Sequence, residues 1–98
     1  MTLEEFRTTL SSSQPPSVPA ALQALWHDAH ADWDAAHEMA NSVDDPTGAW
    51  VHAYLHRKEG DLGNAAYWYK RAGQPVATDA LEVEWERIAS ALLAPKLT

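Results

Sequence analysis

From residue 20 onward, apolar residues recur at the three- and four-residue spacings of amphipathic helices. The first such helix carries an apolar face of Leu22, Leu25, Trp26 and Ala29. The second carries a face of Trp33, Ala36, Ala40 and Val43. Because only a short polar turn separates them, we expect these two helices to form an antiparallel hairpin.

A second pair of helices follows the break at DDPTG. The third helix, from about Ala49 to Glu59, is apolar around most of its circumference and must be covered on more than one side. Gly60 suits a left-handed helix end, and Asp61 can cap the next helix. The fourth helix should bury a stripe made of Leu62, Ala65, Ala66, Tyr69 and Ala72.

The two ends of the chain add further helices. Thr2 and Glu5 match a capping box, which predicts a short helix from about Leu3 to Leu10. The linker SSSQPPSVP follows and leaves that segment loosely attached, so we divide the chain into a segment 1–17 and a helical domain 18–98. A last helix begins at Thr78 or Asp79. Its buried stripe is Leu81, Trp85, Ile88, Ala89 and Leu92, and its outer side carries Glu82, Glu84, Glu86 and Arg87.

The two hairpins are related by a shift of 29 residues, which aligns two histidines and two turn aspartates among other residues. The aligned identities are Ala20 with Ala49, Ala24 with Ala53, His27 with His56, Asp32 with Asp61, Ala36 with Ala65, and Pro46 with Pro75. The stretch GDLGNAAYWYKRA resembles the junction between the two helices of tetratricopeptide and Sel1-like repeats. The segment WVHAYLHRKEGDLGNAAYWYKRAG also resembles a group of small microbial proteins of uncharacterised activity.

These patterns together predict an all-α fold of five helices, with two tetratricopeptide-like antiparallel hairpins plus a C-terminal capping helix. What the repeat resemblance implies is a scaffold that presents a groove to a peptide or protein partner. The 98 residues suffice for one core, and with no cysteine the chain forms neither disulfides nor thiolate metal sites. Without a long apolar run or a basic leader, we expect a cytoplasmic protein that does not enter membranes.

Charge is distributed unevenly around a formal net charge of −7. Residues 1–46 carry one basic and eight acidic side chains, whereas residues 47–75 carry four basic and two acidic ones. The overall charge argues against nucleic-acid binding. The basic middle favours an anionic partner or head-to-tail association with a second copy, although ordinary solvated surface would explain the same pattern.

Histidines are the most prominent candidates for chemistry. His52 and His56 lie one helical turn apart and could share a metal ion, with a third ligand from His27, His30 or Asp34. Glu59 lies too far along the same helix, about 10.5 Å of rise from His52, to converge with both histidines. The alternative, which we favour, is that the histidines pack between helices and bond to the backbone.

Other site patterns are weaker. Asp28, Asp32, Asp34 and Glu38 crowd the first corner and could act as acids or bases, but helix-end carboxylates are usually solvated caps. GDLGN lacks the residues of a phosphate-binding loop, and we expect no cofactor. A small metal-dependent or acid/base enzyme, using His52 and His56 with this corner, is the second hypothesis for function.

Aromatic and basic side chains suggest an interaction surface. Tyr67, Trp68 and Tyr69 point in three directions around one helix, so at least one of them is exposed or lies at an interface. The predicted binding surface comprises Trp50, Tyr54, Tyr67, Lys70 and Arg71. We therefore expect a non-catalytic module that binds a protein or peptide, or forms a homodimer, through this surface.

Overall fold

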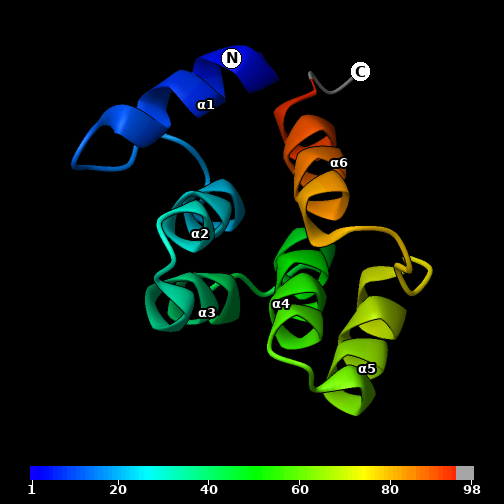
Figure 1. The fold of residues 1–98 in the computed structure, drawn as a ribbon. Helices are drawn as coiled ribbons and strands as arrows, with labels where there is room; N and C mark the ends of the chain where they lie inside the picture. Colours follow the sequence, from blue (N-terminus) through cyan, green and yellow to red (C-terminus); the bar gives the residue numbers. More distant parts are fainter. Residues whose placement is uncertain (95–98) are drawn as a thin grey trace.

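The computed structural model describes residues 1–94 and contains six α-helices with no strand among those residues (Figure 1). The helices are α1 (Leu3–Thr8), α2 (Ala20–Ala29), α3 (Trp33–Asn41), α4 (Pro46–Lys58), α5 (Leu62–Ala72) and α6 (Leu81–Leu93), with a 3₁₀ turn at Thr9–Ser11. The all-α prediction is confirmed, whereas the predicted count of five helices was one too low. None of these helices is long and apolar enough to span a bilayer.

Both hairpin corners have the same backbone conformation. Ala31 in the α2–α3 corner and Gly60 in the α4–α5 corner have positive φ angles of 59° and 89°. The N–H of Asp32 donates to the carbonyl of His27 across 3.1 Å, and the equivalent bond in the second corner measures 3.0 Å. This is the closing bond of a helix C-terminus that ends in a left-handed residue.

The following helix begins in the same way at each corner. The carboxylate of Asp32 accepts the N–H of Ala35 at 3.1 Å, and that of Asp61 accepts the N–H of Asn64 at 3.2 Å. Each aspartate thus caps the second helix of its hairpin. The 29-residue sequence relation therefore corresponds to two corners built with the same hydrogen bonds.

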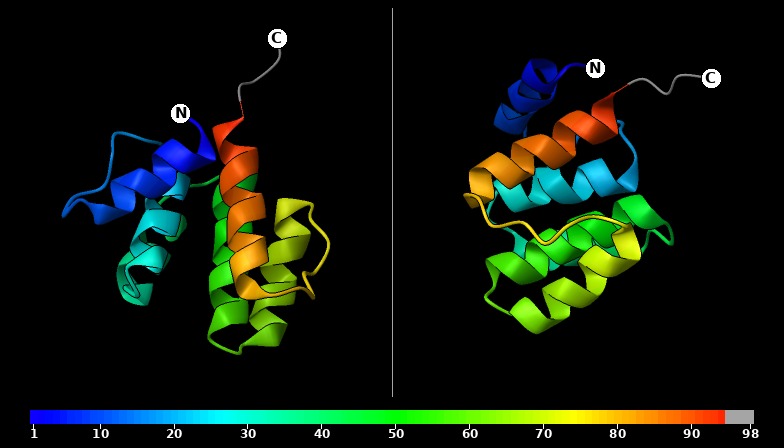
Figure 2. Two further views of the ribbon diagram at one scale, coloured as in Figure 1. Left: turned by 45° about the horizontal axis from the view of Figure 1, so that its top comes forward. Right: turned by 90° about the vertical axis from the view of Figure 1, so that its right-hand side faces the viewer.

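Helix α4 is the centre of the fold. It contacts α2, α3, α5 and α6, and the six consecutive residues 51–56 are all buried. Figure 2 shows α6 lying across α2 and α4, with α5 at the edge of the molecule. The prediction that this helix is covered on more than one side is confirmed.

The N-terminal helix, which the predicted count of five left out, belongs to the same core. Phe6 has no exposed surface, and its ring stacks on Trp85 of α6 with 5.8 Å between centroids. The indole N–H of Trp26 donates to the carbonyl of Thr9 at 3.2 Å. Aromatic contacts with α2 and α6 thus anchor the segment that precedes the serine- and proline-rich linker. The expectation that this segment is loosely attached is therefore wrong.

Helix α6 differs from its predicted pattern at Glu84, which is fully buried rather than on the outer side. Its carboxylate accepts a hydrogen bond from Arg57 of α4 at 2.8 Å and another from the hydroxyl of Tyr69 of α5. The buried charge is therefore paired and hydrogen-bonded, as burial requires. Trp85, Ile88 and Ala89 are buried as predicted.

The start of α6 also differs from the prediction. The helix begins at Leu81, later than the predicted start at Thr78 or Asp79. Asp79 does not cap the helix, because its carboxylate accepts two hydrogen bonds from Arg87 at 2.6 and 3.2 Å. An ion pair with a residue two turns along the helix has replaced the cap.

Replacing Glu84 with alanine should lower the free energy of unfolding by about 3 kcal/mol, because the guanidinium of Arg57 would stay largely buried without its carboxylate. Urea denaturation followed by circular dichroism measures this change. The matched control is Glu82→Ala on the same helix. Glu82 is exposed, so this replacement should change the free energy of unfolding by less than about 0.5 kcal/mol. Equal losses in the two variants would contradict the stabilising role of the buried pair.

Replacing Ala31 with glycine should raise the free energy of unfolding by about 0.5–1 kcal/mol, because alanine is strained at positive φ. The reverse change, Gly60→Ala, should lower it by a similar amount. A Cβ at Gly60 would meet nothing within 4 Å, so that loss would come from the backbone alone. Thermal unfolding of both variants tests this prediction, and the same sign of shift in both would refute it.

Candidate functional site

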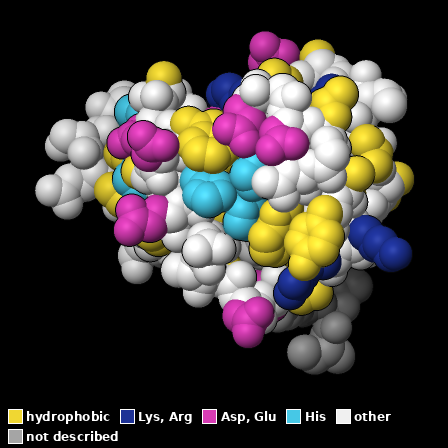
Figure 3. Space-filling view, turned by 90° about the horizontal axis from the view of Figure 1, so that it is seen from below, with side chains coloured by type: hydrophobic (Ala, Val, Ile, Leu, Met, Phe, Trp, Pro, Cys, Tyr) yellow, Lys and Arg dark blue, Asp and Glu magenta, His cyan; other side chains and the backbone are white. Residues whose placement is uncertain are grey.

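Three histidines from two helices converge on one face of the molecule (Figure 3). The ring centroid of His37 lies 4.5 Å from that of His52 and 5.2 Å from that of His56, and the last two are 4.8 Å apart. One ring nitrogen from each residue lies within 4.8 Å of the other two. We call these residues the histidine cluster.

Helix geometry brings the cluster together. His52 and His56 are one turn apart on the central helix α4, so they project from the same side, and both are buried. His37 comes from α3, which packs on α4, and is half-buried. The structure therefore unites the predicted pair with His37, rather than with the expected His27, His30 or Asp34.

The sequence did contain a signal for His37. This residue lies four positions after Trp33 and three before Ala40, so it belongs to the inward face already assigned to that helix. The indole N–H of Trp33 donates to the carbonyl of Leu55 on α4 at 2.9 Å, which confirms that this face meets α4. The prediction did not include His37, because the other residues assigned to this face are apolar.

Two tryptophans hold the cluster rings in place. Trp68 of α5 stacks on His52 with 3.9 Å between centroids and 10° between planes. Trp33 of α3 stacks on His37 at 4.8 Å and 11°. Each tryptophan restricts rotation of the imidazole on which it stacks, and this preorganises the cluster.

Burial favours the neutral form of His52 and His37. Burial, reinforced by the nearby His37 and His56, lowers the pKa of His52 to about 4. Burial and the charge of His56 also lower the pKa of His37, although Glu59 and Asp34 oppose that shift. At neutral pH both residues are thus imidazoles with a free nitrogen lone pair.

A carboxylate supports the cluster from the corner. The Nδ1 atom of His56 lies 2.7 Å from Oε1 of Glu59, one turn further along the chain. This contact orients the ring and directs its Nε2 atom away from Glu59. His56, Glu59 and Asp61 form a second, more exposed group of potential metal ligands.

An aromatic and basic surface adjoins the cluster on α5. The guanidinium of Arg71 lies 5.1 Å from the ring centroid of Trp68 and 5.7 Å from that of Tyr67, and it donates to the Tyr67 hydroxyl at 3.0 Å. His52, Trp68 and Arg71 together line a hollow of about 280 Å³ that also includes Asp44. Because Trp68 contacts both groups, the cluster and this surface form one continuous face.

The predicted binding residues are only partly brought together. Tyr67, Lys70 and Arg71 are exposed on α5, with Tyr67 53% exposed. Tyr54 is buried and donates to Asp28 at 2.8 Å, so it does not lie on the surface as expected. Trp50 is half-buried and lines a different hollow with residues 74–79. Sequence reasoning placed Tyr54 on the surface because it could not assign the sides of a nearly all-apolar helix.

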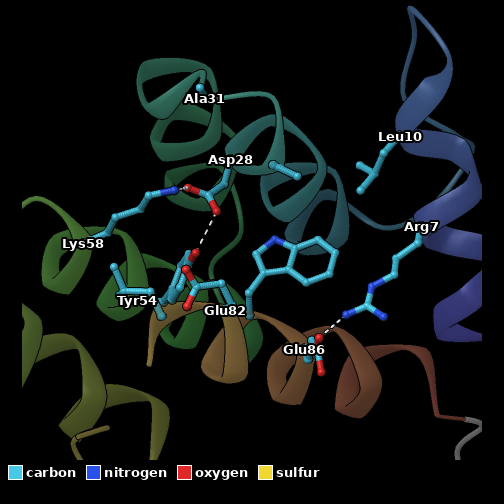
Figure 4. A pocket seen from close by; sticks show the side chains of 11 residues that line it. Arg7, Leu10, Asp28, Ala31, Tyr54, Lys58, Glu82 and Glu86 are labelled. Atoms are coloured by element: carbon cyan, nitrogen blue, oxygen red, sulfur yellow. Dashed lines mark hydrogen bonds and ion pairs between the residues drawn. The ribbon is translucent and has the colours of Figure 1, made fainter. Parts of the chain in front are cut away.

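A larger hollow of about 490 Å³ lies between α1, α2, α4 and α6 (Figure 4). Asp28 at its edge accepts hydrogen bonds from Tyr54 and from Lys58, the latter at 2.9 Å. Arg7 forms an ion pair with Glu86 across the opposite end. These charged side chains thus bond to one another, joining α2 to α4 and α1 to α6.

Asp28 of the acidic corner lies away from the histidine cluster. Asp28 bonds to Tyr54, and Asp32 caps α3. A two-residue offset turns the helix by about 200°, so Tyr54 projects from the opposite side of α4 to His52. The second hypothesis combined His52 and His56 with the corner carboxylates. Asp28 does not lie near these histidines, so it cannot act together with them.

His30 bonds to the backbone, as predicted for the histidines, although this residue is exposed. Its Nδ1 atom lies 2.9 Å from the carbonyl oxygen of Trp26, and its Nε2 atom lies 2.8 Å from that of Leu10. His27 contacts the edge of the Trp26 ring. Neither residue reaches the cluster, so both provide controls for experiments on it.

Stability should fall as the pH is lowered from 6.5 to about 4. In this range His52 takes up a proton in the unfolded chain but not in the folded one, so each added proton favours unfolding. Urea denaturation in the presence of EDTA measures how the free energy of unfolding changes with pH. His52→Gln should reduce this slope by at most about 1.4 kcal/mol per pH unit. His37 and His56 also face this ring and remain in the variant. His27→Gln is the control, and an unchanged slope in His52→Gln would exclude this linkage.

Comparisons with known proteins found no match among protein-family models, curated proteins or solved structures. The resemblance to tetratricopeptide and Sel1-like repeats therefore rests on the residues quoted above. The repeated corners at Ala31 and Gly60 add a structural similarity between the two halves of this chain.

Proposed function

We propose that the protein is a cytoplasmic, non-catalytic interaction module with tetratricopeptide-like hairpins. It binds a protein segment through the outer side of α5, and the simplest such partner is a second copy of the chain. The observation that carries this proposal is the exposure of large apolar residues on the edge helix. Leu62 is 66% exposed and Tyr67 is 53% exposed.

The edge position of α5 explains this exposure. Its main helix contact is α4, and only Ala65 and Tyr69 of the helix are buried. Leu62 and Ala66, which the periodicity predicted to be buried, are exposed instead. In stacked helical repeats a neighbouring repeat covers this side, so a partner can take that position here.

The chemistry of the surface suits a protein interface. Tyrosine, tryptophan and arginine are enriched at interaction hot spots, and Tyr67, Trp68 and Arg71 contact one another here. Their mutual contacts hold the three side chains in one arrangement before a partner binds. This preorganisation reduces the entropy lost on binding.

Charge complementarity supports a second copy as the partner. Lys70 and Arg71 are exposed on α5, whereas Asp34 and Glu38 are exposed on α3. In a two-fold dimer the basic surface of each copy would meet the acidic surface of the other. Such an interface would be weakened by salt.

Sedimentation velocity over a wide concentration range tests this proposal. The wild-type chain should self-associate, and Tyr67→Ala/Arg71→Ala should weaken association at least about 30-fold, as expected for loss of hot-spot side chains. The matched control is Val83→Ala, which removes an exposed apolar residue from α6. A wild-type chain that stays monomeric, or equal association in the double variant, would refute the proposed interface.

A further inference from the structure

We propose that His37, His52 and His56 form a binding site for a divalent transition-metal ion, with Zn²⁺ as the representative ion. Each residue offers a ring nitrogen, and these nitrogens lie within 4.8 Å of one another. Two neighbouring helices supply them, so the site depends on the tertiary fold. The site does not require the interaction surface at Tyr67 and Arg71.

The spacing of the nitrogens suits a small ion. Zn–N bonds of about 2.1 Å place the nitrogens of a tetrahedral site about 3.4 Å apart. The nitrogens of the cluster lie within 4.8 Å of one another, so binding would draw them somewhat closer together. His52 and His56 also have the i, i+4 relation by which a single helix supplies two zinc ligands.

The donor set selects the class of ion. Three imidazoles favour zinc, copper or nickel, whereas calcium and magnesium prefer oxygen ligands. Cysteine is absent from the chain, so thiolates do not contribute. Three protein nitrogens leave one tetrahedral position for water or another small ligand.

The surroundings of the cluster have the features of a supported metal site. Glu59 contacts Nδ1 of His56 at 2.7 Å, which is the usual place of an outer carboxylate behind a metal-bound histidine. Trp33 and Trp68 stack on the other two rings and restrict their orientation. The hollow of about 280 Å³ beside His52 provides access from solvent.

Native mass spectrometry and isothermal titration of the full chain, stripped with EDTA, test this site. Zn²⁺ should bind with one ion per chain, whereas Mg²⁺ and Ca²⁺ should not bind. The fluorescence of the tryptophans should also change, because Trp33 and Trp68 contact the proposed ligands. Absence of zinc binding to the folded chain would overturn the proposal.

Variants locate the ion. His37→Gln, His52→Gln and His56→Gln should each weaken Zn²⁺ binding by more than about 100-fold, and Glu59→Gln by about 10-fold. His27→Gln and His30→Gln should bind like wild type. Unchanged affinity in His37→Gln with a large loss in Asp61→Asn would instead place the ion on the alternative group of His56, Glu59 and Asp61, and would refute the cluster.

Two further controls keep the result unambiguous. His37 is half-buried, so His37→Gln is the variant expected to keep the fold, and circular dichroism in EDTA verifies its helix content. Tyr67→Ala/Arg71→Ala should retain Zn²⁺ binding, since neither residue belongs to the cluster. Loss of self-association without loss of zinc affinity would separate the interaction surface from the metal site.

Discussion

Burial of α4 on every side is the constraint on which the rest of the structure depends. Residues 51–56 are buried consecutively, so this helix cannot turn a polar side toward water. Its buried polar side chains therefore need hydrogen-bond partners. Tyr54 bonds to Asp28 of α2, and Arg57 bonds to Glu84 of α6. These bonds set the positions of the surrounding helices relative to α4.

The same constraint explains the histidine face. His52 and His56 occupy the side of α4 that meets α3 and α5, where their neighbours are His37 and Trp68 rather than water. The neutral imidazole of His52 tolerates this environment better than a charged side chain would. The metal site and the interaction surface that we propose are adjacent, with Trp68 in contact with both.

Local patterns predicted much of the fold but less of the site. The corner aspartates Asp32 and Asp61 cap the helices that periodicity placed after them. The pair His52 and His56 was recognised because both belong to one helix. His37 was missed because nothing local shows which residue of α3 lies opposite them. Inter-helix distances follow from packing rather than from spacing along one helix.

The sequence by itself determined the helical elements, their turns and the relation between the hairpins, because periodicity, caps and left-handed residues act within a few positions. Only the tertiary structure decided that Glu84 is buried and Leu62 is exposed. The burial of Glu84 depends on Arg57, 27 residues away in the sequence, and the exposure of Leu62 depends on the edge position of its helix. Neighbours that lie far apart in the chain decide such environments, so a local pattern cannot specify them.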